Sequence, residues 1–323
     1  MRGYLVRRLI LIIPTLFLST LIVFLIARSI PGSVIELMAS QMEMGGMVSG
    51  GVTVDVDYLR SQMGLDVPVH VQYLRWAGGI ITRGDFGNSL WTRRPLKDDF
   101  ATSYPVTFEL SLMALLISLI VAIPIGVYSA IRQDTISDYL GRSFAIAGLS
   151  IPNFWIATMI VVFPAIWWKW SPPIEYIPLV KNPLGNLGQF ILPATIMGIS
   201  SSAGLMRMTR TLMLEVLRND YIRTAWSKGL TEKTVVLRHA LRNVSLPLIT
   251  MLGARIPGLL GGAVIMEQIF GLPGVGRLML NAINGRDYPV ISGVNLIMAA
   301  FTLVIILITD ISYAYLDPRM KYR

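Results

Sequence analysis

Long apolar runs alternate with polar segments along the chain. The first run, residues 9–27, is almost unbroken and long enough to cross a bilayer as a helix. Five more runs of similar character follow it, at residues 104–130, about 140–168, 189–208, 244–270 and 288–316. The pattern predicts an all-α polytopic membrane protein with six transmembrane helices.

A cleaved signal peptide is the alternative for residues 1–27, because both kinds of segment combine a positive start with an apolar run. The run exceeds a typical signal core, and the sequence after it, Ser29-Ile-Pro-Gly32, is a poor cleavage site. We therefore expect residues 1–27 to contain a retained first span.

Two polar stretches interrupt the apolar pattern, and their charges differ. Residues 28–103 hold seven Lys and Arg against eight Asp and Glu, whereas residues 207–243 hold eight against three. Positive loops stay in the cytoplasm, so we expect residues 207–243 and both termini inside the cell. Residues 28–103 then form a sizeable extracytoplasmic domain, with short helices expected at 57–63, 69–81 and 95–102.

Composition supports this membrane assignment. Hydrophobic residues make up 54% of the 323 and charged residues 15%, against about 25% charged in soluble domains. The chain has no cysteine and a net charge of +9, so disulfides and thiolate chemistry are excluded. The positive excess lies in the predicted inner segments rather than on a soluble domain, which argues against a nucleic-acid partner.

Residues 218–247 lie between two apolar runs and resemble neither. Asn219 or Asp220 can cap a helix start, and Gly229 can end that helix in a left-handed turn. Two apolar series spaced by four residues follow the predicted helix: Leu217, Tyr221 and Ala225, and Ile222, Trp226 and Leu230. Thr231 can cap a second short helix. A solvated basic loop between two spans is the plainer interpretation of the same pattern.

No catalytic motif is present in the sequence. It contains no Gly-x-x-x-x-Gly-Lys-Ser/Thr loop for ATP phosphates, no His-Glu-x-x-His and no Gly-x-Ser-x-Gly. The chain is therefore expected not to be an enzyme and to hold no cofactor or metal itself.

Several motifs carry a family resemblance. Arg223-Thr-Ala-x-x-x-Gly229, the 238–243 run Arg-His-Ala-Leu-Arg-Asn and Leu246-Pro247 resemble the cytoplasmic "EAA" loop of ATP-binding cassette (ABC) importer permeases. Arg223 and Thr224 stand where the general pattern has Glu and Ala, a variant similar to the dipeptide/oligopeptide/nickel branch. Further similarity to that branch lies in residues 4–15, 67–76, 84–89, 286–289 and 316–319.

This resemblance implies a type I importer permease fold. The domains would be 1–27, the extracytoplasmic 28–103, a five-helix core 104–316 with a cytoplasmic coupling loop 209–243, and the tail 317–323. It also implies a bacterial or archaeal plasma membrane and a set of partners. These are a second homologous permease subunit, two cytoplasmic ATPase subunits that bind ATP and Mg, and an extracytoplasmic solute-binding protein.

By the same resemblance, residues of the first loop helix would couple to the ATPases: Asn219, Asp220, Tyr221, Ile222, Arg223, Thr224, Ala225, Trp226, Lys228 and Gly229. Peptide is the expected cargo. Oligosaccharides, nickel chelates, glutathione and opines are the alternatives that the branch allows. An ion-coupled secondary transporter is a more distant alternative, since few acids lie within the spans.

A substrate path through the spans is predicted near polar or kinked positions. Asn153 follows a proline that interrupts the third span, and Ser201 lies in a run of small residues in the fourth. Arg255 and Glu267 are charged residues within the fifth span, and charge at such depth either lines an aqueous path or joins helices structurally. Asp310, in the sixth span, raises the same question.

Overall fold

The structure is a computed structural model that describes residues 2–29, 34–38, 60–61, 64–173 and 175–316. In this part of the chain the secondary structure is helical apart from one isolated β-bridge between Asn88 and Pro95. Most of the predicted helix 57–63 and the tail 317–323 lie outside the described residues.

Five helices are long and apolar enough to cross a membrane. They are α1 (Arg2–Ser29), α5 (Leu96–Ile131), α8 (Pro183–Leu217), α11 (Leu241–Phe270) and α13 (Tyr288–Leu316). The pair α6 (Ile136–Ser150) and α7 (Asn153–Trp168) meets the same test together but is bent by 84° at the intervening break. The described residues therefore contain five candidate spans, or six if the bent pair counts as one.

The bend falls where the sequence predicts an interruption. Ile151 and Pro152 separate the two helices, and both have extended backbone angles. Since proline disfavours helical geometry in the residue before it, the helix breaks at Ile151 rather than curving through. The sharp angle was not foreseen: the sequence predicts a kinked span rather than two helices at 84°.

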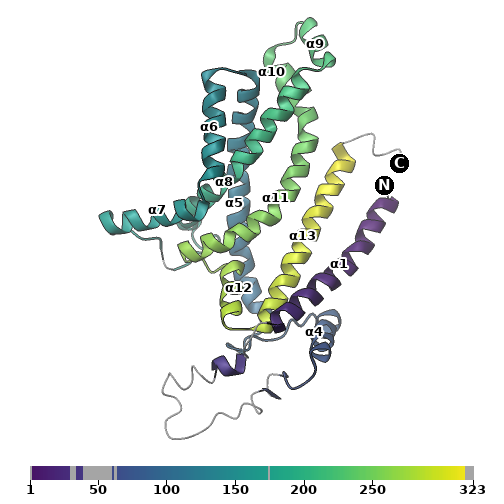
Figure 1. Ribbon diagram of the computed structural model, residues 1–323, viewed down its shortest axis with the longest axis vertical. Coiled ribbons are helices and arrows are strands. Elements are labelled where there is room, and N and C mark those ends of the chain that lie inside the picture. Colours follow the sequence, from purple (N-terminus) through teal and green to yellow (C-terminus); the bar gives the residue numbers. More distant parts are fainter. Residues whose placement is uncertain (1, 30–33, 39–59, 62–63, 174, 317–323) are drawn as a thin grey trace. The chain divides into compact units, whose positions relative to one another are not determined.

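The chain forms two compact units. Of the described residues, the first contains 106–173, 175–276 and 304–316. Within it α6 and α11 both pack on α8, and Figure 1 shows α6 running beside α8 and α5. Glycines allow the close approaches: a Cβ on Gly126 or Gly198 would collide with backbone of α8 or α5, respectively. Small residues thus let the backbones of α5 and α8 approach closely.

The second unit contains the described residues up to 105 and residues 277–303. Its described elements are α1, α4 (Val69–Arg83), the first turns of α5, most of α12 (Val275–Asn284) and the first part of α13. Tyr73 of α4 shares a 3.0 Å hydrogen bond with Thr20 of α1 and packs edge-on against Phe24. The helix predicted at 69–81 is thus confirmed as α4, which runs two residues further.

Two predicted boundaries were wrong. Residues 95–102 were expected to form a separate short helix, but they are the first turns of α5, which starts at Leu96. Leu96 and Phe100 are buried, and the helix continues through Pro105 into the apolar run. Second, the short helix expected after Thr231 does not end before the fifth span. It continues through α10 (Glu232–Thr234) and a π-helical turn, η1 (Val235–Ala240), into α11.

Candidate functional site: the α8–α11 loop

Helix α9 (Asp220–Ser227) joins α8 to α10 and carries most of the predicted coupling residues. Asn219 is its N-cap residue by backbone conformation, and its side chain makes no capping hydrogen bond. Asp220 lies in the first turn, where a carboxylate interacts favourably with the helix dipole. The predicted start of the helix is therefore confirmed.

Gly229 ends α9 in a Schellman motif, the reversal that closes a helix with a left-handed residue. The N–H of Gly229 donates to the Trp226 carbonyl at 2.9 Å, and the N–H of Leu230 donates to the Ala225 carbonyl at 3.4 Å. Gly229 has φ +75°, which side chains with a Cβ adopt only at a cost. A Cβ there would meet nothing within 4 Å, so glycine is favoured by backbone conformation rather than by space.

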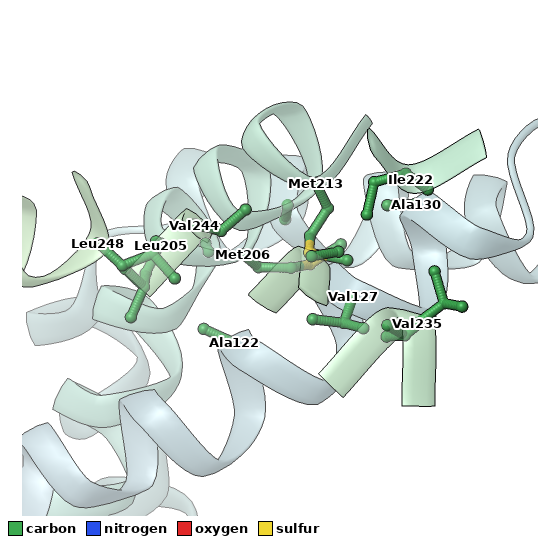
Figure 2. Close-up of a cluster of buried hydrophobic side chains, with 14 of the residues drawn as sticks. Ala122, Val127, Ala130, Leu205, Met206, Met213, Ile222, Val235, Val244 and Leu248 are labelled. Atoms are coloured by element: carbon green, nitrogen blue, oxygen red, sulfur yellow. The ribbon is translucent and has the colours of Figure 1, made fainter. Parts of the chain in front are cut away.

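One face of α9 is buried against other helices of the first unit. Ile222 is 0% and Ala225 6% exposed, and both belong to a hydrophobic cluster built from α5, α8, η1 and α11. Figure 2 shows Ile222 in this cluster, which also contains Met213 of α8 and Val235 of η1. Burial of a side chain such as Ile222 contributes about 1.5–3 kcal/mol. Helix α9 thus packs against α8, which precedes it, and α11, which follows it.

The opposite face of α9 is open. Tyr221 and Trp226 are each 44% exposed, and Arg223, Thr224, Ser227 and Lys228 are exposed as well. With about 100° between successive residues, Tyr221 and Trp226 flank the buried ridge on either side. The two apolar series predicted from the sequence are therefore each split, because Ile222 and Ala225 turn inward while the two aromatics remain half exposed.

A buried carboxylate connects three helices, α5, α6 and α8, near this loop. Asp138 of α6 is 0% exposed and receives both Nε and Nη2 of Arg210 from α8 at 2.7 Å. Arg142 donates to it at 3.1 Å, the Asp134 N–H at 3.0 Å, and the Ser129 hydroxyl of α5 donates as well. Five donors satisfy a charge that would otherwise be costly to bury.

Two of the predicted substrate-path residues lie together. Arg255 of α11 donates from Nη1 to the Ser201 carbonyl of α8 at 2.8 Å. Its guanidinium occupies the space beside Gly204, where a Cβ would overlap it. Ser201 and Arg255 are both half-buried. Asn153, at the start of α7, is also half-buried.

The fourth predicted substrate-path residue is Glu267. It lies twelve residues along α11 from Arg255, or about 18 Å at 1.5 Å per residue. It is 0% exposed and accepts a 2.5 Å hydrogen bond from Thr107 of α5. Thr107 in turn accepts from the Val275 N–H at 2.8 Å, and a Cβ on Gly274 would overlap the Glu267 carboxylate. Glu267 therefore holds the turn at 271–276 against α5.

A second polar site lies in the other unit. Asp287 accepts hydrogen bonds from the Ser89 hydroxyl at 2.6 Å and the Leu90 N–H at 3.1 Å, and the Trp91 indole donates to the Gly285 carbonyl at 2.7 Å. Burial raises the pKa of the Asp287 carboxyl, and these hydrogen bonds oppose that shift. A cavity of about 470 Å³ adjoins this site, between Trp91, Asp99 and Asn281.

Comparison with known proteins shows what kind of chain carries this loop. Residues 122–322 match the family described as "Binding-protein-dependent transport system inner membrane component". The chain belongs to this family. The match covers the whole α8–α11 loop and the helices on both sides of it.

Full-length relatives of this family member are known. It is 38% identical over 325 residues to the "Oligopeptide transport system permease protein AppB" of Bacillus subtilis, with 100% of each chain covered. It is 34% identical over 347 residues to the "Dipeptide transport system permease protein DppB" of Escherichia coli K12, again with full coverage of both. A putative peptide transport system permease protein of Brucella abortus is 36% identical over 322 residues.

Among solved structures, the fold resembles one chain of the inward-facing MetNI methionine ABC transporter. The TM-score is 0.55 at 15% identity, with 69% of this chain and 98% of that chain covered. At that identity the likeness concerns the fold alone. It supports the expected family fold of the importer permeases.

Two functional-looking clusters in this family member escaped the sequence analysis. Nothing in the sequence linked Arg210 of α8 to Asp138 and Arg142 of α6, which the structure brings together. A buried cation in α8 that needs a partner was the available signal. Likewise, the segments 84–89 and 286–289 were each noted as similar to the family, but nothing in the sequence indicated that Asp287 joins them.

Proposed function

We propose that this protein is the permease subunit of a peptide importer driven by separate ATPase subunits. The match to the inner membrane components of binding-protein-dependent transport systems carries the transport role. Relatives named for oligopeptide and dipeptide transport, aligned over the full length of both chains, support peptide as the cargo. Oligosaccharides, nickel chelates, glutathione and opines remain the alternatives within the same transport role.

In this proposal α9 is the element that the ATPases move. Its open face offers Tyr221 and Trp226 beside the polar and charged Arg223, Thr224 and Lys228, and exposed aromatics beside arginine are typical of protein interfaces. Its buried face contacts the cluster formed by α5, α8, η1 and α11. A displacement of α9 would thus be passed to membrane helices through packed side chains. ATP and Mg would be bound by the partner subunits.

The remaining assignments follow from this role. Both termini and α9 would lie in the cytoplasm, and residues 28–103 outside, where a solute-binding protein would deliver the peptide. A second homologous permease subunit would complete the path across the membrane. Within this chain, the contact of Arg255 with Ser201 is the proposed position on that path, with Asn153 and Glu267 as the other predicted path residues.

The decisive experiment compares the two faces of α9 in the assembled transporter. Trp226→Asp places a charge on the open face, and we expect it to weaken co-purification of the ATPase subunit by about thirtyfold, as losses at aromatic hot spots do. The thermal stability of the permease should stay close to that of the unmodified protein, because Trp226 is 44% exposed.

Ile222→Ala is the matched control on the buried face. It should lower stability by about 2–5 kcal/mol, while a chain that still folds retains the ATPase. Ala225→Asp is unsuitable for this purpose, because Ala225 is 6% exposed and the variant would bury a charge. Unchanged ATPase binding in Trp226→Asp, with transport intact, would overturn the proposed role of α9.

A further inference from the structure

Three arginines surround a cavity of about 310 Å³ between α6 and α8 in the first unit. Arg142 comes from α6, and Arg207 and Arg210 come from α8. The remaining wall is almost entirely apolar, with Ala145, Ile146 and Leu149 of α6 on one side. The cavity thus combines a cationic end with an apolar wall.

The charges in this cluster do not cancel. Arg142 and Arg210 are paired with the carboxylates of Asp138 and Asp134, which leaves the third arginine in excess. Among the described residues, the Arg207 guanidinium has neither a hydrogen bond nor an ion pair, and its charge repels that of Arg255. Nε of Arg142 is also buried without a hydrogen-bond partner in the part of the chain described. The cavity therefore offers free donors and one uncompensated positive charge.

The spacing of these residues along α6 fits a phospholipid, whose charged headgroup and acyl chain follow one another. Arg142 lies six residues into α6, about 9 Å from the start of the helix, whereas Ile146 and Leu149 lie about 6 and 10 Å further along it. Tyr139, Arg142, Ile146 and Leu149 share one helix face, since their spacings are close to whole turns. Tyr139, Ile146 and Leu149 are 57%, 64% and 52% exposed. An apolar face thus continues from the arginines into the depth of the membrane.

We propose that this cavity binds an anionic phospholipid, with its phosphate at Arg207 and Arg142 and an acyl chain along Ile146 and Leu149. Arginine forms strong, charge-assisted hydrogen bonds with phosphate oxygens. Basic pockets between transmembrane helices bind anionic headgroups in this way. Arg207, positioned within a span, gains the counter-ion that its own chain does not supply. The inference needs only the membrane location of the chain and does not depend on its cargo.

The test uses the assembled transporter in nanodiscs of phosphatidylcholine with or without phosphatidylglycerol. Native mass spectrometry then counts the lipids that stay bound to this chain. We expect retention of phosphatidylglycerol over phosphatidylcholine, and Arg207→Gln should reduce that preference by about fivefold, the effect of one basic residue near an anionic surface. Arg207→Lys should restore most of it.

Arg218→Gln is the matched control, because it removes an exposed positive charge from the end of the same helix. It should leave the preference unchanged. Ile146→Ser tests the acyl contact. It should reduce lipid retention, whereas any stabilisation of the protein by inorganic phosphate alone should persist, which separates a lipid from a free phosphate.

Two results would overturn the proposal. One is equal retention of both lipids in the unmodified protein and in Arg207→Gln. The other is that phosphatidylglycerol is retained by the isolated chain but excluded from the assembled transporter, because the surface would then be the interface with another subunit. Melting curves of every variant exclude loss of the fold as the reason for reduced binding.

Discussion

At the scale of single residues, backbone conformation and buried charge decide what can be replaced. Gly229 has φ +75° and ends α9 where no side chain would collide with a Cβ. Asp287 is a buried acceptor that joins its own segment to Ser89 and Leu90, which lie almost 200 positions earlier in the sequence. Neither role shows in the hydrophobic pattern, although the glycine was expected to stop a helix.

Gly229→Ala should destabilise the end of α9 by about 1 kcal/mol, because alanine disfavours the left-handed conformation. Gly229→Asn should cost less, since asparagine adopts this conformation more readily than other side chains. Hydrogen exchange of the α9 amides measures both effects. Equal protection in the two variants would show that the glycine is not required for its conformation.

The raised pKa of Asp287 predicts that the stability of the second unit depends on pH. Burial raises its pKa in the folded protein, so the folded state binds a proton more readily than the unfolded chain. The resulting stability is complete below the unfolded pKa of about 3.9 and is lost as the pH rises through the higher folded value. Hydrogen exchange of the Trp91 indole N–H, which donates to the Gly285 carbonyl, reports on this site at a series of pH values.

Asp287→Asn should remove that pH dependence, because an amide keeps an acceptor oxygen without titrating. Asp287→Ala should cost about 1–3 kcal/mol, since the Ser89 hydroxyl and the Leu90 N–H would lose their partner. A pH profile in Asp287→Asn that matches the unmodified protein would show that another group is responsible.

At the scale of elements, the helices and their order were largely predictable, whereas their breaks and partnerships were not. Apolar runs located the spans, because a membrane helix must be apolar over its whole length. The 84° bend between α6 and α7, and the continuity from α10 through η1 into α11, depend on packing that a local pattern does not contain. The split of the α9 apolar residues into buried and exposed pairs has the same origin.

The network around Asp138 is the clearest example of an element-level feature that the sequence did not predict. It connects α5, α6 and α8 at the level where α8 approaches the loop. Arg210→Met leaves a buried carboxylate without its bidentate partner, and we expect a loss of about 3–5 kcal/mol. Replacing Asp138 by Asn and Arg210 by Met together should recover part of this loss, as measured by chemical unfolding. No recovery in the double variant would show that the pair acts independently.

At the scale of the whole molecule, the account rests on the family to which the chain belongs and on the side of the membrane that α9 faces. Family membership covers residues 122–322 and full-length relatives cover the rest. Charge counting predicts that α9 and both termini lie inside the cell, with residues 28–103 outside. Because the chain contains no cysteine, a single introduced cysteine gives an unambiguous reporter of sidedness and proximity.

The most direct measurement is therefore cross-linking from Trp226→Cys in the assembled transporter, together with labelling of intact cells. We expect the cysteine to cross-link to an ATPase subunit and to resist a membrane-impermeant thiol reagent, while Ile81→Cys in α4 reacts with that reagent. The exposed face of α9 would then be both cytoplasmic and in contact with the subunit that hydrolyses ATP. Labelling of Trp226→Cys from outside the cell, or failure to cross-link in a transporter that retains its ATPase, would contradict the account.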